Sequence, residues 1–337
     1  MSQFKKLVQD VSRNINAHNL VLNGQSILLA VSGGSDSIAL LKIFQTFRKS
    51  RNLKLSVAHV NYNMRPTASD AESIVANICQ DAQMPLFIKH CDLTNEAKKM
   101  QRSIEDSARI LRYDFFIECC LKNDIDCIAT AHNLNDQTET ILMQLLRGTG
   151  LKGLSGISNK RQEKNKPLIR PMLTISKERV LTSLSEQGVD YNEDETNLDP
   201  TYLRNRIRLK LLPTLTKDYN DSFDSHLCTL AADARETYEF LKFSAQRVLK
   251  DATIKKREGI ALAMPVLRQY PPVVRKEVFL QALTVLTGKR AGFTRSDVDI
   301  LDEFSQSNSA KAIVLKKRVQ AAIKKNQLHI TLSLKTR

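Results

Sequence analysis

The sequence contains no tryptophan, and aromatic residues account for only 6% of its 337 positions. Broad platforms on which unpaired nucleobases stack are therefore limited. No pair of its six cysteines has C-x-x-C spacing, and no histidine follows at zinc-finger spacing, which argues against the common zinc modules. Several cysteines lie in apolar runs, where cysteine is usually a small buried hydrophobe. We therefore expect reduced thiols.

Long apolar segments are also missing. No stretch approaches the roughly 18 apolar residues that a membrane helix needs, and the first residues, MSQFKKLVQD, contain no apolar signal core. We expect a soluble, cytoplasmic protein with no membrane partner. The hydrophobic content of 42% is sufficient for a sizeable core, and at about 100–200 residues per domain the length predicts two domains.

Acidic residues are scarce in one part of the chain only. The formal charge is +15, but residues 1–201 hold 25 basic and 23 acidic side chains, against 26 and 13 in residues 202–337. A near-neutral part joined to a basic part is typical of a catalytic domain with a nucleic-acid-binding appendage. A basic solvated face without a partner is the alternative.

Four short apolar runs alternate with helical patterns in the first half. The expected strands are 26–31, 53–60, 85–90 and 125–131, and the expected helices are 37–50, 68–83, 103–122 and 136–147. This alternation predicts an α/β fold with a doubly wound parallel sheet. Ligands bind such sheets at the carboxyl ends of the strands, so we expect the site there.

The pattern weakens beyond residue 158. We expect an exposed basic loop at Asn159–Lys166, and later a helix over 202–212 that ends at Pro213. The remaining expected elements are helices at 176–187, 222–257 (or a hairpin of two), 273–287 and 295–305, an acidic loop at 188–200, and strands at 312–315 and 328–332. We predict a catalytic domain over 1–213, a helical linker region over 214–264 and a small basic α+β domain over 265–337.

A serine- and glycine-rich turn follows the first expected strand and opens a helix. It consists of Ser32, Gly33, Gly34, Ser35, Asp36 and Ser37. The glycines permit a tight turn, and inward amides, the helix N-terminus and the hydroxyls would form a cradle for phosphate oxygens. Asp36 suits such a place if it holds Mg²⁺ beside the anion. The alternative is an ordinary turn in which Asp36 caps the helix.

Two nucleotide-binding motifs are excluded. No G-K-[ST] occurs, so the turn is not a Walker A loop. The string Gly148-x-Gly150-x-x-Gly153 matches the dinucleotide fingerprint, but it follows a helical run instead of a strand. We expect these glycines to end a helix and form a loop over the site.

The turn SGGSDS resembles the PP-loop of the ATP pyrophosphatases. Four further stretches resemble the tRNA(Ile)-lysidine synthetase family within that superfamily. They are 59–65 (HVNYNMR), 108–116 (ARILRYDFF), 130–157 (beginning TAHNLNDQTET), and 194–197 (DETN) followed by 202–213 (YLRNRIRLKLLP). There are two departures: Tyr62 stands where the family usually has histidine, and Asn135 replaces the first acid of H-x-x-D-D-Q, so Asp136 must supply the carboxylate.

The resemblance implies that the enzyme adenylates the wobble cytidine of a CAU-anticodon isoleucine tRNA with ATP and Mg²⁺, and then ligates free L-lysine to carbon 2. It assigns ATP to the turn, with Mg²⁺ at Asp36. Our candidate catalytic residues are Arg112, His132, Asp136 and Arg204. Asp136 and Glu139 are candidates for binding lysine, and Arg206, Arg208 and the basic domain for binding tRNA. Which of His132 and Asp136 accepts the proton of the amine stays open, as does the oligomeric state, a homodimer included.

Each of these residues also has a simpler interpretation. Arg109 and Arg112 could form surface ion pairs, and His59 could be a satisfied structural histidine. His132, Asp136 and Glu139 suit the start of a helix. Two other functions compete: a PP-loop tRNA thiolase, which would use cysteine pairs or an iron–sulfur cluster, and an RNA-binding protein without catalysis.

Overall fold

The computed structural model describes residues 2–63, 68–192, 201–254, 259–288, 292–307, 312–316 and 319–332. The chain divides into two compact units, Met1–Ala232 and Asp233–Arg337, and the division falls within helix α11 (Phe223–Ala252). Each unit has its own buried core. Among the described residues, no helix is both long enough and apolar enough to cross a membrane.

The first unit is built on a six-stranded sheet with the order β3-β2-β1-β4-β6-β5. Its strands are β1 (Ser26–Ala30), β2 (Lys54–Asn61), β3 (Leu86–His90), β4 (Cys127–Ala129), β5 (Lys160–Glu163) and β6 (Lys166–Ile169). All neighbouring pairs are parallel except β5 with β6. The predicted parallel sheet and its four expected strands are confirmed.

The basic loop expected at Asn159–Lys166 is wrong, because these residues form most of a β-hairpin. β5 pairs antiparallel with β6, and the two turn residues, Lys164 and Asn165, have positive φ angles of 45° and 69°. β5 is the last strand of its sheet, and its side chains alternate between exposed and half-buried. An edge strand of this kind carries charges instead of an apolar run, so hydrophobic pattern alone misses it.

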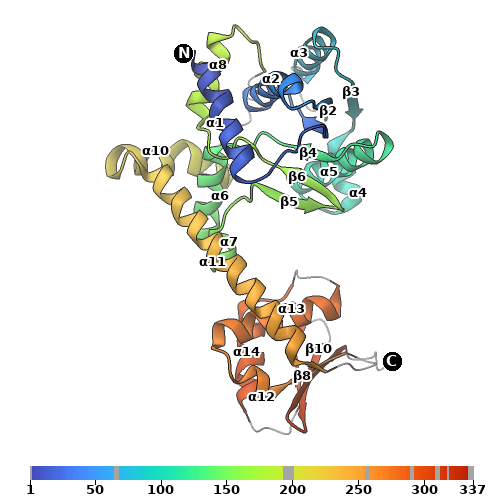
Figure 1. The fold of residues 1–337 in the computed structure, drawn as a ribbon, viewed down its shortest axis with the longest axis vertical. Coiled ribbons are helices and arrows are strands. Elements are labelled where there is room, and N and C mark those ends of the chain that lie inside the picture. Colours follow the sequence, from blue (N-terminus) through green and yellow to red (C-terminus); the bar gives the residue numbers. More distant parts are fainter. Residues whose placement is uncertain are drawn as a thin grey trace. The chain divides into compact units, whose positions relative to one another are not determined.

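Helices cover both faces of this sheet (Figure 1). They are α1 (Gln3–Ala17), α2 (Ser35–Ser50), α3 (Ala68–Asp81), α4 (Leu93–Met100), α5 (Ile104–Lys122), α6 (Leu134–Leu146), α7 (Leu151–Leu154) and α8 (Lys177–Glu186). In β1, Ile27 and Leu29 face the core that α1, α2, α3 and α8 complete, and Leu28 faces the core of α5. Burial on both faces explains why β1 reads as a continuous apolar run.

A continuous helical stretch at 203–219 follows the sheet. It consists of α9 (Leu203–Arg206), the π-helical turn η2 (Ile207–Leu211), α10 (Leu212–Thr214) and a second π-helical turn, η3 (Leu215–Tyr219). The expected end at Pro213 is wrong. Pro213 lies in the first turn of α10, where a missing N–H is tolerated, and the wider turns on either side re-route the backbone hydrogen bonds.

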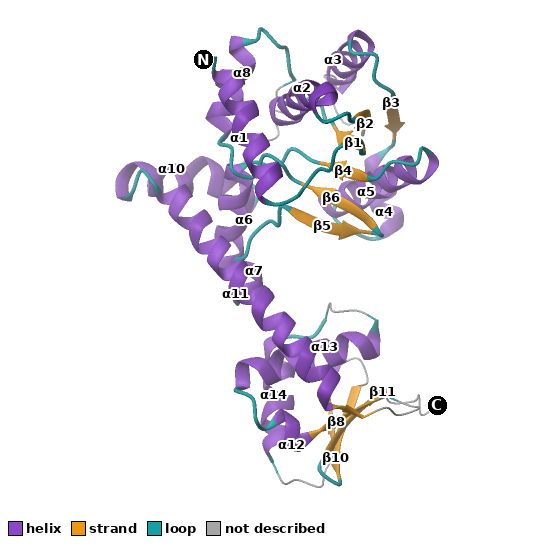
Figure 2. Cartoon of the chain, in the orientation of Figure 1, coloured by secondary structure: helices purple, strands orange, loops and turns teal. Residues whose placement is uncertain are grey.

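The second unit combines an antiparallel sheet of order β7-β8-β11-β10-β9 with helices (Figure 2). Its elements are β7 (Thr253–Ile254), β8 (Ile260–Ala263), α12 (Met264–Leu267), α13 (Pro272–Thr287), α14 (Arg295–Gln306), β9 (Ile313–Val314), β10 (Val319–Lys324) and β11 (Gln327–Leu332). Phe279 and Leu301 are buried at the centre of its core. The sequence predicted both main helices and two of these strands.

Candidate functional site

The serine- and glycine-rich turn links β1 to α2 at the carboxyl edge of the sheet. Gly33 has φ +90°, and a Cβ atom built on it would lie 2.8 Å from the Cβ of Ala71, so only glycine fits. Gly34 is the N-cap of α2 and offers no side-chain cap to the first helical N–H groups. Ser37 shapes the turn: its hydroxyl donates to the Gly34 carbonyl (2.8 Å) and accepts from the Ser32 N–H (3.1 Å).

Asp36 is held by two residues from distant parts of the sequence. Lys177, at the start of α8, places Nζ 2.7 Å from Asp36 Oδ2 and 2.6 Å from the Ser35 hydroxyl. Asn133 donates from Nδ2 to Asp36 Oδ1 at 3.0 Å. Sequence reasoning missed Lys177 and Asn133. The available signal was their place just beyond β6 and β4, where a parallel sheet gathers its ligand-binding residues.

Asn135, one of the two departures from the family pattern, supports this arrangement. Its side-chain oxygen accepts a hydrogen bond from the backbone N–H of Lys177 at 2.9 Å. The contact needs an acceptor and no charge, so the amide serves it as well as a carboxylate would.

Two carboxylates and two arginines form a second group at the same edge, here called the carboxylate–arginine cluster. Asp136 and Glu139 lie on the first turns of α6, and Arg204 and Arg208 lie on the 203–219 helical stretch. Arg204 donates from Nε to Glu139 (2.6 Å) and from Nη2 to Asp136 (2.7 Å). Arg208 donates from Nε to the other Glu139 oxygen at 2.6 Å.

Glu139 is the buried member of the carboxylate–arginine cluster, whose two arginines remain about a third exposed. Glu139 is 0% exposed, although it is a carboxylate. Burial alone would lower the pKa of Arg204, but Asp136 and Glu139 raise it above the ordinary value, so the guanidinium stays charged. Buried charges of both signs are thus paired, as burial requires.

His132 lies between β4 and α6, and its Nδ1 is 2.9 Å from the Thr130 hydroxyl. Burial, and then the positive charges of Arg170, Arg204, Arg109 and Arg112, lower the pKa of His132 to about 3. The imidazole is therefore neutral near pH 7 and a weak base.

Tyr62, the second departure from the family pattern, orients Arg112. Its hydroxyl donates to the Ala108 carbonyl (3.0 Å) and accepts from Arg112 Nε (3.2 Å). His59 points elsewhere: its Nδ1 lies 2.9 Å from the Val31 carbonyl, and burial lowers its pKa. This contact agrees with the structural interpretation of His59.

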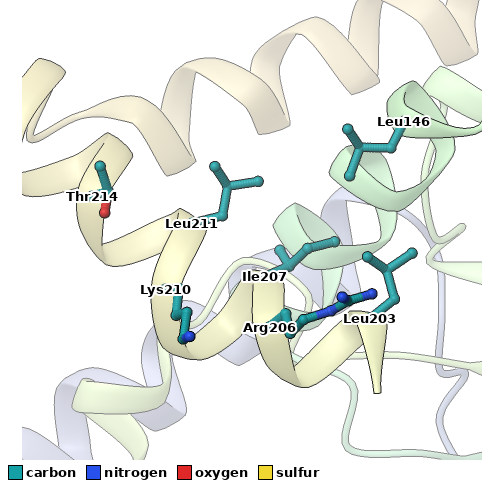
Figure 3. A pocket seen from close by; sticks show the side chains of 7 residues that line it. All are labelled: Leu146, Leu203, Arg206, Ile207, Lys210, Leu211 and Thr214. Carbon is teal, nitrogen blue, oxygen red and sulfur yellow. The ribbon is translucent and has the colours of Figure 1, made fainter. Parts of the chain in front are cut away.

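Arg206 does not join the carboxylate–arginine cluster. With Lys210 it lines a cavity of about 360 Å³ between α6 and the 203–219 stretch, over an otherwise apolar floor that includes Leu146 and Ile207 (Figure 3). Arg206 and Arg208, which the sequence groups together, therefore lie on two different faces of the helix. The motif residues 64–65 and 194–197 lie outside the described residues.

Comparisons with known proteins identify the relatives of this chain. Residues 2–215 match the family model of the PP-loop domain. A tRNA(Ile)-lysidine synthase of Chlorobaculum tepidum is 35% identical over 80% of this chain and 81% of its own length. A bifunctional protein TilS/HprT of Listeria innocua is 32% identical over 95% of this chain, and the chain spans about half (49%) of that relative.

A solved structure supports the fold alone. The U34-tRNA thiolase NcsA of Methanococcus maripaludis, determined with its [4Fe-4S] cluster, superposes with a TM-score of 0.59 over 69% of this chain and 79% of its own. The two sequences share only 17% identity, so the likeness carries no argument about chemistry.

Proposed function

This chain belongs to the PP-loop family and, within it, to the tRNA(Ile)-lysidine synthases. From that premise we propose that it uses ATP to ligate free L-lysine to carbon 2 of the wobble cytidine of a CAU-anticodon isoleucine tRNA. One observation carries the proposal: a cradle for an anion and a shielded pair of carboxylates lie at one edge of the sheet, bridged by Asn133. ATP and an amine are the two small substrates that this pairing suits.

In the first step, the cytosine 2-oxygen attacks the α-phosphorus of ATP, and the bond to the β-phosphate breaks as diphosphate leaves. The amides at the start of α2 and the Lys177 ammonium would stabilise the departing charge. Arg112, fixed by Tyr62, and Arg204 are our candidates for the oxygens of the transferring phosphoryl group.

In the second step, the ε-amine of lysine attacks carbon 2 of the activated base. The carbon–oxygen bond breaks, and AMP leaves with the former base oxygen. The amine has an ordinary pKa of about 10.4 and must lose a proton first. We assign this step to Asp136, because it lies in the carboxylate–arginine cluster that would bind the amine, and we assign neutral His132 as a hydrogen-bonding group near the α-phosphate.

Lysine binding is assigned to Asp136 and Glu139. All four of their carboxylate oxygens already accept a hydrogen bond, from Arg204, Arg208 or the Asn133 N–H. Glu139 Oε2 accepts a second hydrogen bond, from Arg208 Nη2 at 3.1 Å. The other three oxygens each keep a lone pair, and Asp136 is the more exposed of the two acids, so an ammonium can bind there without expelling the arginines. The arginines would then hold the carboxylates charged and in place.

Mg²⁺ is proposed to accompany ATP. Among the described residues, no three His, Cys, Asp or Glu side chains lie together as a metal site. Asp36 offers a single carboxylate beside the phosphate cradle, which fits Mg²⁺, since this ion is usually held by one or two carboxylates together with substrate phosphates. The ion would neutralise part of the charge on the β- and γ-phosphates.

The basic second part is proposed to bind tRNA. Residues 202–337 carry 26 basic and 13 acidic side chains, enough to contact several backbone phosphates and to give salt-dependent affinity. We assign Arg206 to the same role because it faces away from the carboxylate–arginine cluster. A cytoplasmic location follows from these substrates.

The thiolase alternative is not favoured by the cysteines. Burial raises the pKa of Cys119 to about 11 and those of Cys120 and Cys127 to about 12. Sulfur relay needs an accessible thiolate, which these buried thiols do not form near neutral pH.

Mass spectrometry tests the proposed reaction. An unmodified isoleucine tRNA transcript is incubated with the protein, ATP, Mg²⁺ and isotope-labelled lysine, and nuclease fragments are weighed. We expect the wobble cytidine to gain one lysine less one water, with AMP and diphosphate released in equal amounts. ATP consumption that requires a sulfur donor, or tRNA binding with no ATP consumption, would support the competing functions instead.

A further inference from the structure

A second group of cations surrounds Tyr113, a buried residue of α5. Arg109 and Arg161 each place the guanidinium carbon 5.1 Å from the centre of the Tyr113 ring. Together the three residues line part of a cavity of about 300 Å³. Arg170, immediately after β6, completes what we call the Tyr113 cluster: Arg109, Tyr113, Arg161 and Arg170.

The charge of the Tyr113 cluster is not balanced within the protein. The two acids that line the cavity are already engaged, since Asp114 pairs with Lys164 at 2.6 Å and Glu163 pairs with Arg161. Across the described parts of the chain, neither Arg109 nor Arg170 has a carboxylate within ion-pair distance. The missing counter-charge is costly at Arg170, which is buried away from water, whereas Arg109 is exposed.

Arg170 shows this cost most clearly. It is only 3% exposed, and although Nη1 donates to the Ser158 carbonyl at 2.6 Å, its buried Nε has no partner in the structure; the same is true of Arg161 Nε. Burial lowers the pKa of Arg170 to about 10; Arg161 and Arg109 act in the same direction, and a hydrogen bond with Tyr113 acts against them. The adjoining cavity, which Arg109 and Arg161 line, is a place where an anion would supply the missing counter-charge.

The position of the Tyr113 cluster separates this anion from the triphosphate of ATP. Arg161 lies on β5, three strands from β1 in the sheet order. Neighbouring strands lie about 4.8 Å apart, so Arg161 is roughly 14 Å across the sheet from the phosphate turn. Arg170 nevertheless lies near His132, because it follows Ile169, whose carbonyl accepts a hydrogen bond from the Thr130 N–H at 3.0 Å, and the Thr130 hydroxyl lies 2.9 Å from His132 Nδ1. The positive charges of Arg170 and Arg109 also lower the pKa of His132.

We infer that the Tyr113 cluster binds a backbone phosphate of the tRNA anticodon loop, next to the nucleotide that reacts. The inference rests on the proposed function for the identity of the RNA. Phosphate contacts fix register and orientation without reading sequence, which is what an enzyme acting on one displaced base requires.

The test combines an arginine substitution in the protein with a phosphate substitution in the tRNA. Arg109→Gln is suitable because Arg109 is exposed, and Arg13→Gln, on α1 across the sheet, removes an equal charge from an exposed site. Isoleucine tRNAs are assembled by ligation, each with one neutral methylphosphonate in the anticodon loop, and Kd is measured by filter binding. We expect one substitution near the wobble position to weaken binding by the wild-type protein about tenfold, and to have little further effect on Arg109→Gln.

Three results would overturn the inference. In the first, Arg109→Gln and Arg13→Gln weaken tRNA binding equally. In the second, every methylphosphonate weakens binding by Arg109→Gln as much as it weakens binding by the wild type. In the third, Arg109→Gln raises the Kd of ATP measured without tRNA and leaves the Kd of tRNA unchanged. Since the measurement reads binding, it is informative even if no lysidine forms. A wild-type protein that modifies tRNA but shows no such coupling would refute this site and leave the proposed function standing.

Discussion

The phosphate turn and the carboxylate–arginine cluster share one edge of one sheet, but they hold charge in opposite ways. At the turn, a single carboxylate, Asp36, lies among helix-terminal amides and the Lys177 ammonium. In the cluster, Asp136 and Glu139 are set against Arg204 and Arg208, and Glu139 is 0% exposed. The turn offers helix-terminal amide donors beside one carboxylate–ammonium pair, whereas the cluster offers carboxylate oxygens whose charge two arginines balance.

The difference indicates how one edge can separate two substrates. The turn favours binding of an anion, because its amides and Lys177 donate hydrogen bonds. The cluster favours binding of an amine, because its carboxylate oxygens accept hydrogen bonds. Asn133 connects the two, since its amide nitrogen donates to Asp36 and its oxygen caps the helix that carries Asp136. The variants below test whether the two regions are separable.

Asp36→Ala should have the largest effect. Removing the carboxylate leaves Lys177 without its partner and removes the proposed ligand of Mg²⁺, so diphosphate release should fall by about 10²–10³-fold. The Kd for tRNA should be nearly unchanged, because the basic part of the chain is untouched. A radiolabelled diphosphate assay and filter binding measure the two quantities.

Asp251→Ala, a change at an exposed position of α11, is the matched control and should behave as the wild type. Normal turnover by Asp36→Ala would refute the assignment of the turn.

Glu139→Gln should be the most costly change to stability. It replaces a fully buried carboxylate by a neutral group and weakens its bonds to Arg204 and Arg208, which are about a third exposed, so the free energy of unfolding should fall by about 2 kcal/mol. Urea denaturation measures the change. Glu118→Gln, which breaks the exposed pair with Lys122, should leave that free energy nearly unchanged. Equal effects from the two variants would show that the cluster is an ordinary surface network.

Lys177→Gln should raise the KM for ATP about tenfold and leave the KM for lysine unchanged, because the ammonium contacts only the turn. Asn135→Asp should stay close to the wild type, whereas Asn135→Leu should shift the KM for ATP in the same direction as Lys177→Gln. Lys98→Gln, exposed on α4, is the control. An effect of Lys177→Gln on lysine instead of ATP would contradict the separation of the two regions.

The last effect concerns pH. The pKa of His132 is about 3 in the folded protein against about 6.5 in an unfolded chain, so protons bind the unfolded state preferentially between these values. This contribution is present above pH 6.5 and is lost as the pH falls. Between pH 7 and pH 5, the wild type should lose about 2 kcal/mol more stability than His132→Gln, as measured by urea denaturation at both values. Identical losses would show that His132 is not shielded.

Much of this fold can be predicted from sequence, for reasons visible in particular segments. β1 is buried on both faces and reads as an unbroken apolar run, and SGGSDS follows it directly. β5 is an edge strand made of charged residues, and Pro213 lies inside a helix that π turns keep continuous, so neither follows the usual signals.

Only those site residues that belong to short, continuous sequence motifs could be predicted. Asp36, Asp136 and Glu139 stand in short motifs. Lys177 and Asn133 gain their importance from contacts across 141 and 97 residues of sequence. Such contacts depend on strand order, which no single segment encodes. Arg206 and Arg208 are two residues apart, yet helix geometry sends them to different faces.

A structure of the protein with a non-hydrolysable ATP analogue and Mg²⁺ tests the central claim most directly. The account predicts the β- and γ-phosphates against the amides of Gly34–Ser37, with Lys177 on their oxygens, and the α-phosphate directed towards His132. A triphosphate bound elsewhere, with the turn and Asp36 untouched, would contradict it.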